Sequence, residues 1–422
     1  MADLLIRDTI LNGAKRDVLI RDGLFAEIAP AIEPPEGVPV LDAGEKLLVP
    51  AFYNGHTHSA MTLLRSFADD LRLFDWLENY VWPAEAKLTS EAIEAGIRLS
   101  VVEMLHSGTV FFNDHYWEPA ITLKVAEDMG MRAAVGRFTL CTPDGKINPR
   151  CTRGNAELLE LYQDCPAKDR VELAYAPHAV YTVPGPILRE LAEEQKSTGG
   201  LFHIHASETV QEVADCRKAH GMTPVAWIDA CGGLGPSTVL AHCVHVTPED
   251  IALIRERGAA IVHNPCSNYK LASGQFPFHA IYEEGHCRVA LGTDGCASNN
   301  NLSFFDEMKL AALNAKIQAN DPTSCPAEAI WRIATREGAQ AMGLDGGAIE
   351  VGRLGDAVLL NPKRACLTPL HNLAADIVYS ADTSCVDAVI CNGRPLMENG
   401  VVPGEEEILA RAESLSRQLL GK

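Results

Sequence analysis

The two ends of the chain share a pattern of short apolar runs separated by turns. Within residues 4–50, Asn12-Gly13 and Asp22-Gly23 stand between alternating apolar and polar positions, which is typical of β-hairpins. A similar pattern returns in residues 355–362, 377–381 and 386–400, where we expect further strands. The two ends therefore predict one small sheet domain assembled from both of them.

The centre of the chain has a different pattern. Short apolar or β-branched runs alternate with longer stretches of helical period, such as residues 90–108, and this alternation predicts βα units around a parallel sheet. Eight runs have the length and composition of strands: residues 47–54, 109–114, 132–138, 171–177, 201–206, 238–243, 259–264 and 288–294. Eight such units favour a closed barrel over an open sheet.

These patterns predict an α/β protein in three parts. We expect a (β/α)8 TIM barrel over residues 49–345 and a small β-sandwich domain made of residues 1–48 and 346–402. Residues 403–422 have the spacing of an amphipathic C-terminal helix. A length of 422 residues suits a barrel with one smaller domain.

Titratable side chains stand at the end of nearly every predicted barrel strand. All these ends meet on one face of a barrel, the face on which barrel enzymes build their active sites. Packing alone does not explain so many of them. The residues are His56 and His58, Asp114 and His115, Arg137, His178, His205, His242, His263 and Asp294.

Several of these residues have the chemistry of a metal site. His56 and His58 are two apart in a strand, so both imidazoles point to the same side and can reach one ion. A lone pair of this kind is equally consistent with polar residues that lead into a loop. His203 and His205 also share one side of their strand, and spacing does not decide between them. With a carboxylate such as Asp294, such imidazoles suit a catalytic zinc ion.

Two further residues could move protons beside that site. Glu208 follows His205 by three positions, where its carboxyl group could stand over a substrate. The same residue could instead favour the N-terminus of the following helix by its charge. His242 ends another strand, and Asp294 lies in a Gly-Thr-Asp-Gly turn.

The composition of the chain limits the kinds of partner that we expect. A net charge of −20 disfavours a nucleic acid or an anionic membrane as a partner. The 13 cysteines form no C-x-x-C pair, and the chain shows neither a signal-like N-terminus nor a long apolar run. We therefore expect a cytoplasmic protein with reduced thiols.

Seven segments in this order resemble the amidohydrolase superfamily, and within it the deaminases of 5′-methylthioadenosine and S-adenosylhomocysteine. The resemblance covers nearly the whole chain. The segments are NGHTHSAMTLLRSFADDL, VWPAEAKLT, APHAVYT, HIHASET, LAHCVH, VHNPCSNYKLASG and LGTDGCASNNNLSFFDEMKLA.

The resemblance implies a metal-dependent hydrolytic deaminase that converts an adenosine derivative to its inosine analogue and ammonia. One divalent ion, Zn²⁺ before Fe²⁺ or Mn²⁺, would be held by four residues: His56, His58, His205 and Asp294. His242 would orient the attacking water, and Glu208 would carry protons between this water and N1 of the adenine ring. The resemblance thus favours His205 over His203, implies a role in purine salvage, and is compatible with a homo-oligomer.

The resemblance also implies a set of substrate contacts. Glu85 matches a position that binds the ribose hydroxyls, and Trp82 lies in the same segment. His178 and Ser298 match contacts to the purine ring. Arg137 matches a residue that pairs with the carboxylate of S-adenosylhomocysteine, and either Arg150 or Arg153 would join it.

The sequence departs from the family pattern in two places, which leaves the substrate open. The second barrel strand ends in FFNDHYWE, with His115 and Trp117, and PAFYNGHTH differs from the commoner form of the first strand end. An alternative is a deaminase or hydrolase of another purine, a pterin or a triazine on the same barrel. A non-catalytic scaffold is disfavoured because every expected metal and catalytic residue is present. A cytidine-deaminase fold is disfavoured because its H-x-E and P-C-x-x-C segments are absent.

Overall fold

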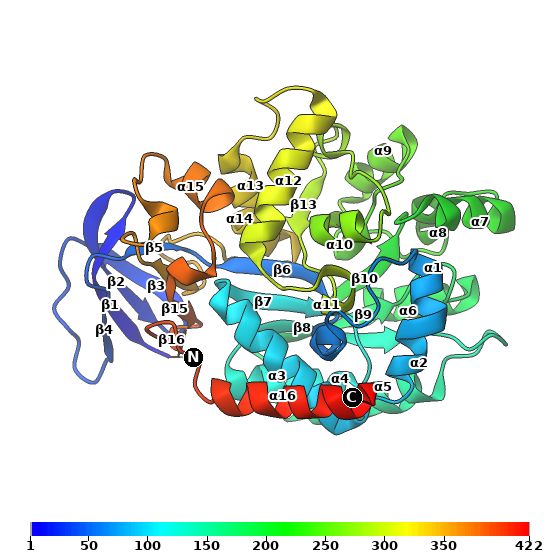
Figure 1. The fold of residues 1–422 in the computed structure, drawn as a ribbon, viewed down its shortest axis with the longest axis horizontal. Coiled ribbons are helices and arrows are strands. Elements are labelled where there is room, and N and C mark those ends of the chain that lie inside the picture. Colours follow the sequence, from blue (N-terminus) through cyan, green and yellow to red (C-terminus); the bar gives the residue numbers. More distant parts are fainter. Residues whose placement is uncertain (1, 422) are drawn as a thin grey trace.

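The computed structural model describes residues 2–421 and contains two sheets, which Figure 1 shows next to each other along the long axis. The larger body is a parallel barrel whose eight strands follow one another in chain order. They are β6 (Phe52–Thr57), β7 (Thr109–Asp114), β8 (Arg132–Thr139), β9 (Val171–Pro177), β10 (Leu201–Ala206), β11 (Thr238–His242), β12 (Ala260–His263) and β13 (Arg288–Leu291). Beyond β13, the Asp294 amide donates to the His56 carbonyl at 3.0 Å and links the last strand to the first. The barrel is nearly closed, and the predicted (β/α)8 fold is confirmed.

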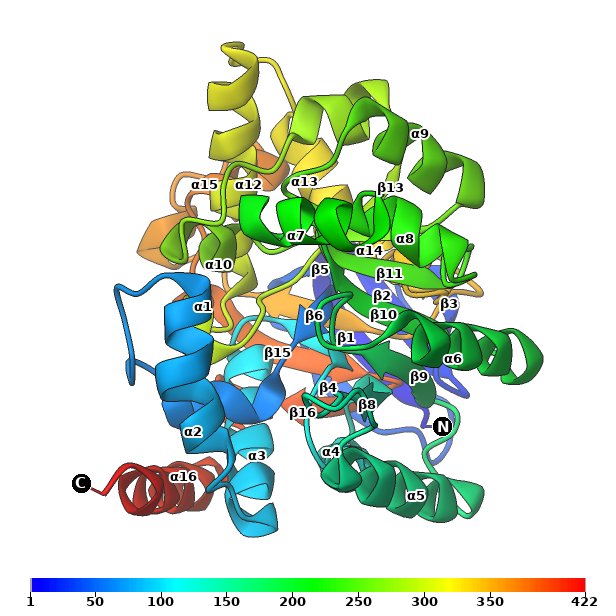
Figure 2. The ribbon, with the colours of Figure 1, turned by 90° about the vertical axis from the view of Figure 1, so that its right-hand side faces the viewer.

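Helices cover the outside of this barrel, as Figures 1 and 2 show from two directions. The longer ones that connect or follow the strands are α3 (Ser90–His106), α4 (Pro119–Met129), α5 (Pro149–Gln163), α6 (Gly185–Thr198), α7 (Val210–His220), α8 (Pro224–Ala230), α9 (Pro248–Arg257), α12 (Phe304–Ala319) and α13 (Ala327–Ala334). Shorter helical segments are η1 (Ser59–Leu64), α1 (Leu73–Trp76), η2 (Leu77–Val81), α2 (Trp82–Glu85), α10 (Pro265–Lys270), η3 (His279–Glu284), α11 (Cys296–Asn299) and α14 (Arg336–Ala341). In the described residues, no helix has the length and the apolar run that a membrane crossing needs.

The second sheet takes strands from both chain ends, as the sequence pattern predicts. Its strands are β1 (Leu4–Leu11), β2 (Ala14–Arg21), β3 (Leu24–Ala29), β4 (Val40–Asp42), β5 (Leu47–Pro50), β14 (Ala357–Leu360), β15 (Val386–Cys391) and β16 (Arg394–Met397). The two ends meet where β5 pairs antiparallel with β14, with Leu48 opposite Leu359. The sheet packs its own small core, which includes Ile6, Phe25 and Leu359.

One predicted strand is divided between the two sheets. Residues 47–54 were expected to form the first barrel strand, but the run breaks between Pro50 and Phe52. Residues before the break pair with β14 in the second sheet, and those after it pair with β7 in the barrel. Proline has no amide hydrogen to donate, which suits it to the end of a ladder. The apolar run is continuous across the break because both segments are buried.

A second expectation is wrong. Residues 377–381 were expected to be a strand, but they begin inside helix α15 (Leu373–Tyr379), which lies between the short helical turns η4 (Ala365–Leu367) and η5 (Thr383–Cys385). The Asn372 side chain accepts a hydrogen bond from the Ala375 amide and caps this helix. Ile377 and Val378 are buried on its inner face, and so short an apolar run does not distinguish a strand from a buried helix.

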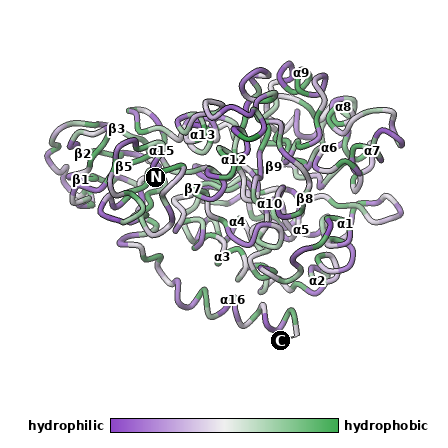
Figure 3. Tube along the Cα trace, turned by 45° about the horizontal axis from the view of Figure 1, so that its top comes forward, coloured by the Kyte–Doolittle hydropathy of each residue, from purple (hydrophilic) through white to green (hydrophobic). Residues whose placement is uncertain are grey.

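The C-terminal helix α16 (Glu405–Leu420) lies against the barrel beside α3 and η1, and it is drawn in red in Figures 1 and 2. Hydrophobic and hydrophilic residues alternate along it, as Figure 3 shows, and Ala412 and Leu415 are buried. The Ser416 hydroxyl donates to the Leu63 carbonyl at 2.8 Å, and the ring Nε2 of His106 lies 2.9 Å from the Glu405 carboxylate. The predicted amphipathic helix is confirmed.

A buried polar cluster joins the barrel to the second sheet. Asp356, which precedes β14, accepts hydrogen bonds from Arg132 Nε at 2.7 Å and from the Tyr53 hydroxyl at 2.8 Å. Its other oxygen accepts from the Asn392 amide at 2.7 Å. Arg132 and Asp356 are at most 1% exposed, so each charge depends on the other for compensation.

We expect Asp356→Ala to lower the free energy of unfolding by about 3–5 kcal/mol, because it leaves the Arg132 charge buried without a partner. Urea unfolding measures the loss. Glu157→Ala is the matched control, since Glu157 forms a half-exposed pair with Lys124 at 3.7 Å and such pairs contribute about 0–1 kcal/mol. Equal losses in the two variants would contradict the role given to the buried cluster.

Candidate active site

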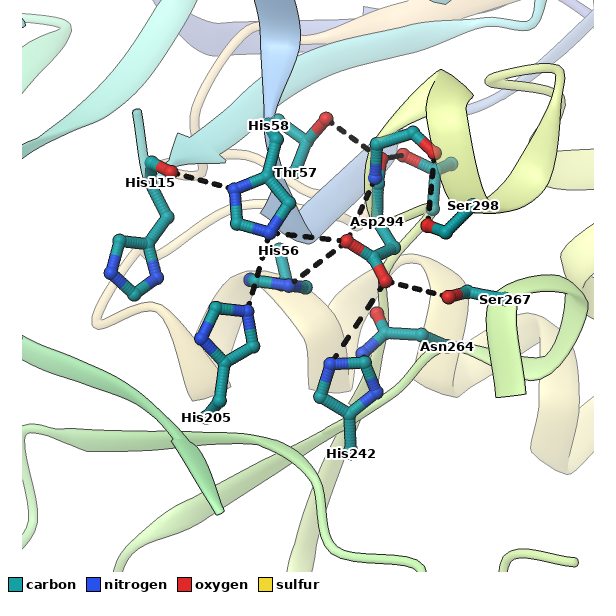
Figure 4. Close-up of polar contacts among 12 residues, drawn as sticks. His56, Thr57, His58, His115, His205, His242, Asn264, Ser267, Asp294 and Ser298 are labelled. Carbon is teal, nitrogen blue, oxygen red and sulfur yellow. Dashed lines mark hydrogen bonds and ion pairs between the residues drawn. The ribbon is translucent and has the colours of Figure 1, made fainter. Parts of the chain in front are cut away.

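Three imidazoles from two barrel strands converge at the carboxyl end of the barrel (Figure 4). The ring Nε2 atoms of His58 and His205 lie 3.2 Å apart. Asp294 places Oδ1 at 3.2 Å from His58 Nε2 and 3.4 Å from His56 Nε2. The sequence prediction brought these four residues to one site, and the structure places them together. Thr57 stays outside the cluster, and its hydroxyl donates to the Asp294 carbonyl at 3.1 Å.

Backbone carbonyls fix the orientation of two of the rings. His58 Nδ1 lies 2.6 Å from the His115 carbonyl, and His205 Nδ1 lies 2.7 Å from the His178 carbonyl. A carbonyl only accepts, so Nδ1 carries the hydrogen in both rings, and in the neutral form that binds a metal each Nε2 presents a lone pair to the cluster. Two lone pairs that face each other at 3.2 Å repel unless a cation lies near both. This donor set therefore fits a divalent metal ion.

Burial and charge support the same conclusion. Burial lowers the pKa of His56 to about 4 and holds the pKa of His205 well below its usual value, so both rings are neutral, as metal ligands must be. Burial opposes the charge of Asp294, but its contacts with His56 and His58 prevail and hold its pKa well below the usual range. His56 Nε2 is buried and has no hydrogen-bond partner among the described residues.

The backbone at this rim has conformations that non-glycine residues rarely adopt. The φ angles of His242 and Asp294 are 75° and 58°, in the left-handed region. A close approach accompanies the second of these turns: a Cβ atom at Gly292 would lie 3.0 Å from the His56 Cβ and 2.4 Å from Asn264 Oδ1. Such strain persists where surrounding contacts over-determine the structure, and it is concentrated at functional sites.

A second group of side chains lies beside the cluster. His242 Nε2 is 3.8 Å from Glu208 Oε2 and 4.0 Å from Asp294 Oδ2. His242 Nδ1 lies 2.8 Å from the side-chain carbonyl of Asn268, so Nδ1 carries the hydrogen and Nε2 is free to accept a proton. Burial raises the pKa of Glu208, an effect that His242 and Ser273 oppose. Glu208 therefore keeps a proton to higher pH than an exposed glutamate does.

The cluster borders a cavity that is also lined by most of the expected substrate residues. The cavity is lined by Trp82, Glu85, His178 and Ser298 together with His58, His205, Glu208, His242 and Asp294. Burial raises the pKa of the Glu85 carboxyl, while Tyr116 and Trp117 oppose the shift. Burial lowers the pKa of His178 to about 3 and keeps that ring neutral.

The position of Arg137 contradicts its expected role as a carboxylate contact. Its side chain points to the helix layer, where it donates to Glu194 at 2.7 Å and lies 4.6 Å over the Tyr175 ring. The next residue, Phe138, points into the cavity instead, because neighbouring side chains of a strand alternate. Of the other two arginines, Arg150 lies at the edge of a neighbouring pocket, and Arg153 is exposed on α5.

Other strand-end residues serve the structure around the site. Asp114 accepts from the Ser59 amide at 2.9 Å and from Thr122 at 2.7 Å. His263 stacks on Phe276 with ring centroids 4.2 Å apart. His203, the alternative to His205, is fully buried, and its Nε2 lies 2.9 Å from Nδ1 of His56, behind the cluster.

Several residues of the site were missed from sequence. Ser267 donates to Asp294 Oδ2 at 2.6 Å, and Ser273 donates to Glu208 Oε1 at 3.1 Å. Glu212 accepts from the backbone amides of Ser207 and Glu208 and holds the turn that carries Glu208. Ser267, Asn268 and Ser273 all lie in the segment VHNPCSNYKLASG, whose run of polar residues after a buried strand was the available signal.

Comparison with known proteins agrees with this geometry. Residues 47–396 match the model of the amidohydrolase family. A 5′-deoxyadenosine deaminase of Methanothermobacter thermautotrophicus is 41% identical over 97% of this chain and 96% of its own length. A 5-methylthioadenosine/S-adenosylhomocysteine deaminase of Archaeoglobus fulgidus is 39% identical over 90% of each chain. A crystal structure of an adenosine deaminase from Xanthomonas campestris with bound zinc superposes with a TM-score of 0.91, covering 100% of this chain and 99% of that chain at 31% identity.

The chain belongs to the amidohydrolase family. The family resemblance noted in the sequence is thereby confirmed. The barrel and the second sheet both lie within the part of this chain that superposes on the zinc-bound adenosine deaminase.

We expect the purified protein to hold about one divalent ion per chain, and His205→Ala to retain less than about a tenth of an ion after gel filtration, because a nitrogen ligand is lost. Elemental analysis measures the content. His371→Ala is the control, since His371 is an exposed histidine outside the site. Unchanged metal content in His205→Ala would exclude this cluster as the metal site.

Proposed function

We propose that this chain is a metal-dependent deaminase of adenosine derivatives with a modified 5′ position, and that its products are the inosine analogue and ammonia. The observation that carries the proposal is the shared cavity: His58, His205, Asp294, Glu208 and His242 line the same space as Glu85. The names of the similar deaminases support the same substrate class. Among possible ions we favour Zn²⁺, which suits imidazole and carboxylate ligands and is bound in the similar adenosine deaminase.

The ion would be held by His56, His58, His205 and Asp294. When bound, it would lower the pKa of a water molecule towards neutrality. His242, held by Asn268, would accept a hydrogen bond from this water through Nε2. His56 and His205 stay neutral because they are buried, and Asp294 stays ionised because it faces His56 and His58.

Glu208 moves the protons of the reaction. It takes one proton from the water and delivers it to N1 of the adenine ring while the water oxygen adds to C6, so the C6–O bond forms as the N1–C6 double bond is lost. It then takes a proton from the added oxygen and passes it to the amino group. The C6–N bond breaks, ammonia leaves, and the ring becomes a hypoxanthine. A buried carboxyl group with a raised pKa suits both halves of this transfer.

The remaining residues of the cavity wall would bind the nucleoside. Glu85 is 6% exposed, and we assign its carboxylate to the ribose hydroxyls, which donate strongly to an ionised acceptor. His178 and Ser298 are assigned to the purine ring, and Trp82 to the wall next to the ribose. Each of these roles rests on the family resemblance, and the place of each residue in the cavity wall supports it.

Incubation of the metal-loaded protein with adenosine, 5′-deoxyadenosine, 5′-methylthioadenosine and S-adenosylhomocysteine tests the function. We expect loss of adenine absorbance and release of one ammonia per nucleoside. Failure to deaminate any of the four would overturn the proposal.

Glu208→Gln should lower kcat by about 10²–10⁴-fold, because glutamine keeps the shape but cannot carry the proton. Steady-state kinetics with the best substrate of the panel measure this loss. Glu193→Gln, an exposed change on α6, is the control. A Glu208→Gln variant with more than about half of the original kcat would show that another group moves the proton.

Asn268→Leu should lower kcat about tenfold and leave KM within about twofold, because His242 loses the partner that fixes its ring. Asn268→Asp keeps an acceptor at the same place and should retain more activity than the leucine variant. Equal kcat values for Asn268→Leu and the unmodified protein would rule out this positioning role.

A further inference from the structure

A second pocket adjoins the cavity of the candidate active site. Trp82, Glu85, Trp117, Leu140 and Tyr181 line both spaces, so the two share a wall. On the proposed function, the purine lies by the imidazoles and the ribose lies at Glu85. The 5′ substituent of the nucleoside then extends past Glu85 into this outer pocket.

The walls of the outer pocket are mostly apolar. Pro143, Val180 and Pro184 join the aromatic rings and Leu140 of the shared wall. Among the described residues that line the pocket, Arg150 is the one cationic side chain. Whether a negatively charged 5′ substituent can pair with a cation in this pocket therefore depends on what else Arg150 contacts.

The Arg150 guanidinium is already engaged. Its Nε and Nη2 donate to one Glu118 oxygen at 3.0 and 2.7 Å. Nη1 donates to the Glu85 carbonyl and Nη2 to the Leu88 carbonyl, each at 3.2 Å. The face of the guanidinium lies 5.2 Å over the Trp117 ring. These four hydrogen bonds occupy N–H groups of Arg150 that a substrate carboxylate would need.

Glu118 is held in turn. Its second oxygen accepts from the Ser90 hydroxyl at 2.6 Å, and its side chain is 19% exposed, as is that of Arg150. A substrate carboxylate that approached Arg150 would have to displace Glu118 or lie beside it as a second negative charge. Arg137 offers no substitute, because it faces Glu194 on the other side of the strand.

We propose that this enzyme prefers adenosine derivatives with an uncharged, apolar 5′ substituent, and that the Arg150–Glu118 pair sets this preference by withholding the guanidinium from a carboxylate. In this arrangement Arg150 is a positioning residue: it holds the backbone of Glu85 and Leu88 at the edge of the pocket. Hydrogen, methylthio and alkylthio groups at the 5′ position suit the apolar walls, whereas the amino-acid end of S-adenosylhomocysteine does not.

The test compares kcat/KM of the full-length, metal-loaded enzyme for 5′-deoxyadenosine, 5′-methylthioadenosine, 5′-butylthioadenosine and S-adenosylhomocysteine. Butylthio and homocysteine groups are similar in length, so their comparison separates charge from size. We expect kcat/KM for the three uncharged substrates to exceed that for S-adenosylhomocysteine by at least about tenfold. An equal or higher value for S-adenosylhomocysteine overturns the inference and leaves the proposed deaminase function intact.

Two variants test the role of the pair. Glu118→Gln weakens the hold on Arg150 and should narrow the gap between the butylthio and homocysteine substrates by about threefold or more. Arg150→Met should lower kcat/KM for both by similar factors, because it loosens the Glu85 backbone. A loss that is tenfold greater for S-adenosylhomocysteine would show that Arg150 binds its carboxylate, which overturns the inference.

Arg137→Met is the control, and it should leave the ratio of the two kcat/KM values unchanged. The ranking of substrates by the unmodified enzyme decides the question even where a variant fails to fold. Absence of turnover with all four substrates would overturn the proposed function, and this inference with it.

Discussion

The structure around the candidate active site depends on one electrostatic constraint, which is that lone pairs face one another in a buried space. His58 and His205 turn Nε2 inward because each Nδ1 is committed to a backbone carbonyl, and Asp294 adds a carboxylate that remains ionised. No rotation of these rings relieves the repulsion without breaking a hydrogen bond to the carbonyl. A cation bound between these lone pairs would turn the repulsion into attraction.

The barrel supplies the rigidity that this constraint needs. The carbonyls that hold the two rings come from the strand ends β7 and β9, so the orientation of each histidine depends on its neighbours in the sheet. Residues further from the imidazole cluster are held in the same way, by hydrogen bonds from their neighbours. Asn268 fixes His242, and Glu212 fixes the turn of Glu208, so side chains that line the cavity are held by side chains outside it.

The sequence predicted the parts that follow from periodicity and from strand ends. The eight barrel strands, the sheet from both chain ends and the C-terminal helix were all predictable, because buried strands and amphipathic helices leave a regular pattern. The rule that strand ends converge also brought His56, His205 and Asp294 together. Periodicity could not show where a continuous apolar run passes from one sheet to another, as it does after Pro50.

The positions of the arginines could not be predicted in the same way. Arg137 and Phe138 are adjacent, and a shift of one residue in the strand decides which of them enters the cavity. The state of Arg150 depends on Glu118 and Ser90, which come from other elements, and no local pattern links them. Similarly, the spacing of two residues gives His203 and His205 the same orientation. Their different positions along the strand place His205 in the cluster and His203 behind it.

The division of one apolar run at Pro50 ties the two sheets together in a particular way. Tyr53 reaches Asp356 through its hydroxyl, and on the same short strand, three residues later, His56 belongs to the imidazole cluster. The second sheet therefore helps to hold the strand that carries His56. A chain shortened to its barrel would lose Asp356 and leave both the Arg132 charge and Tyr53, three residues before His56, without the carboxylate that they share.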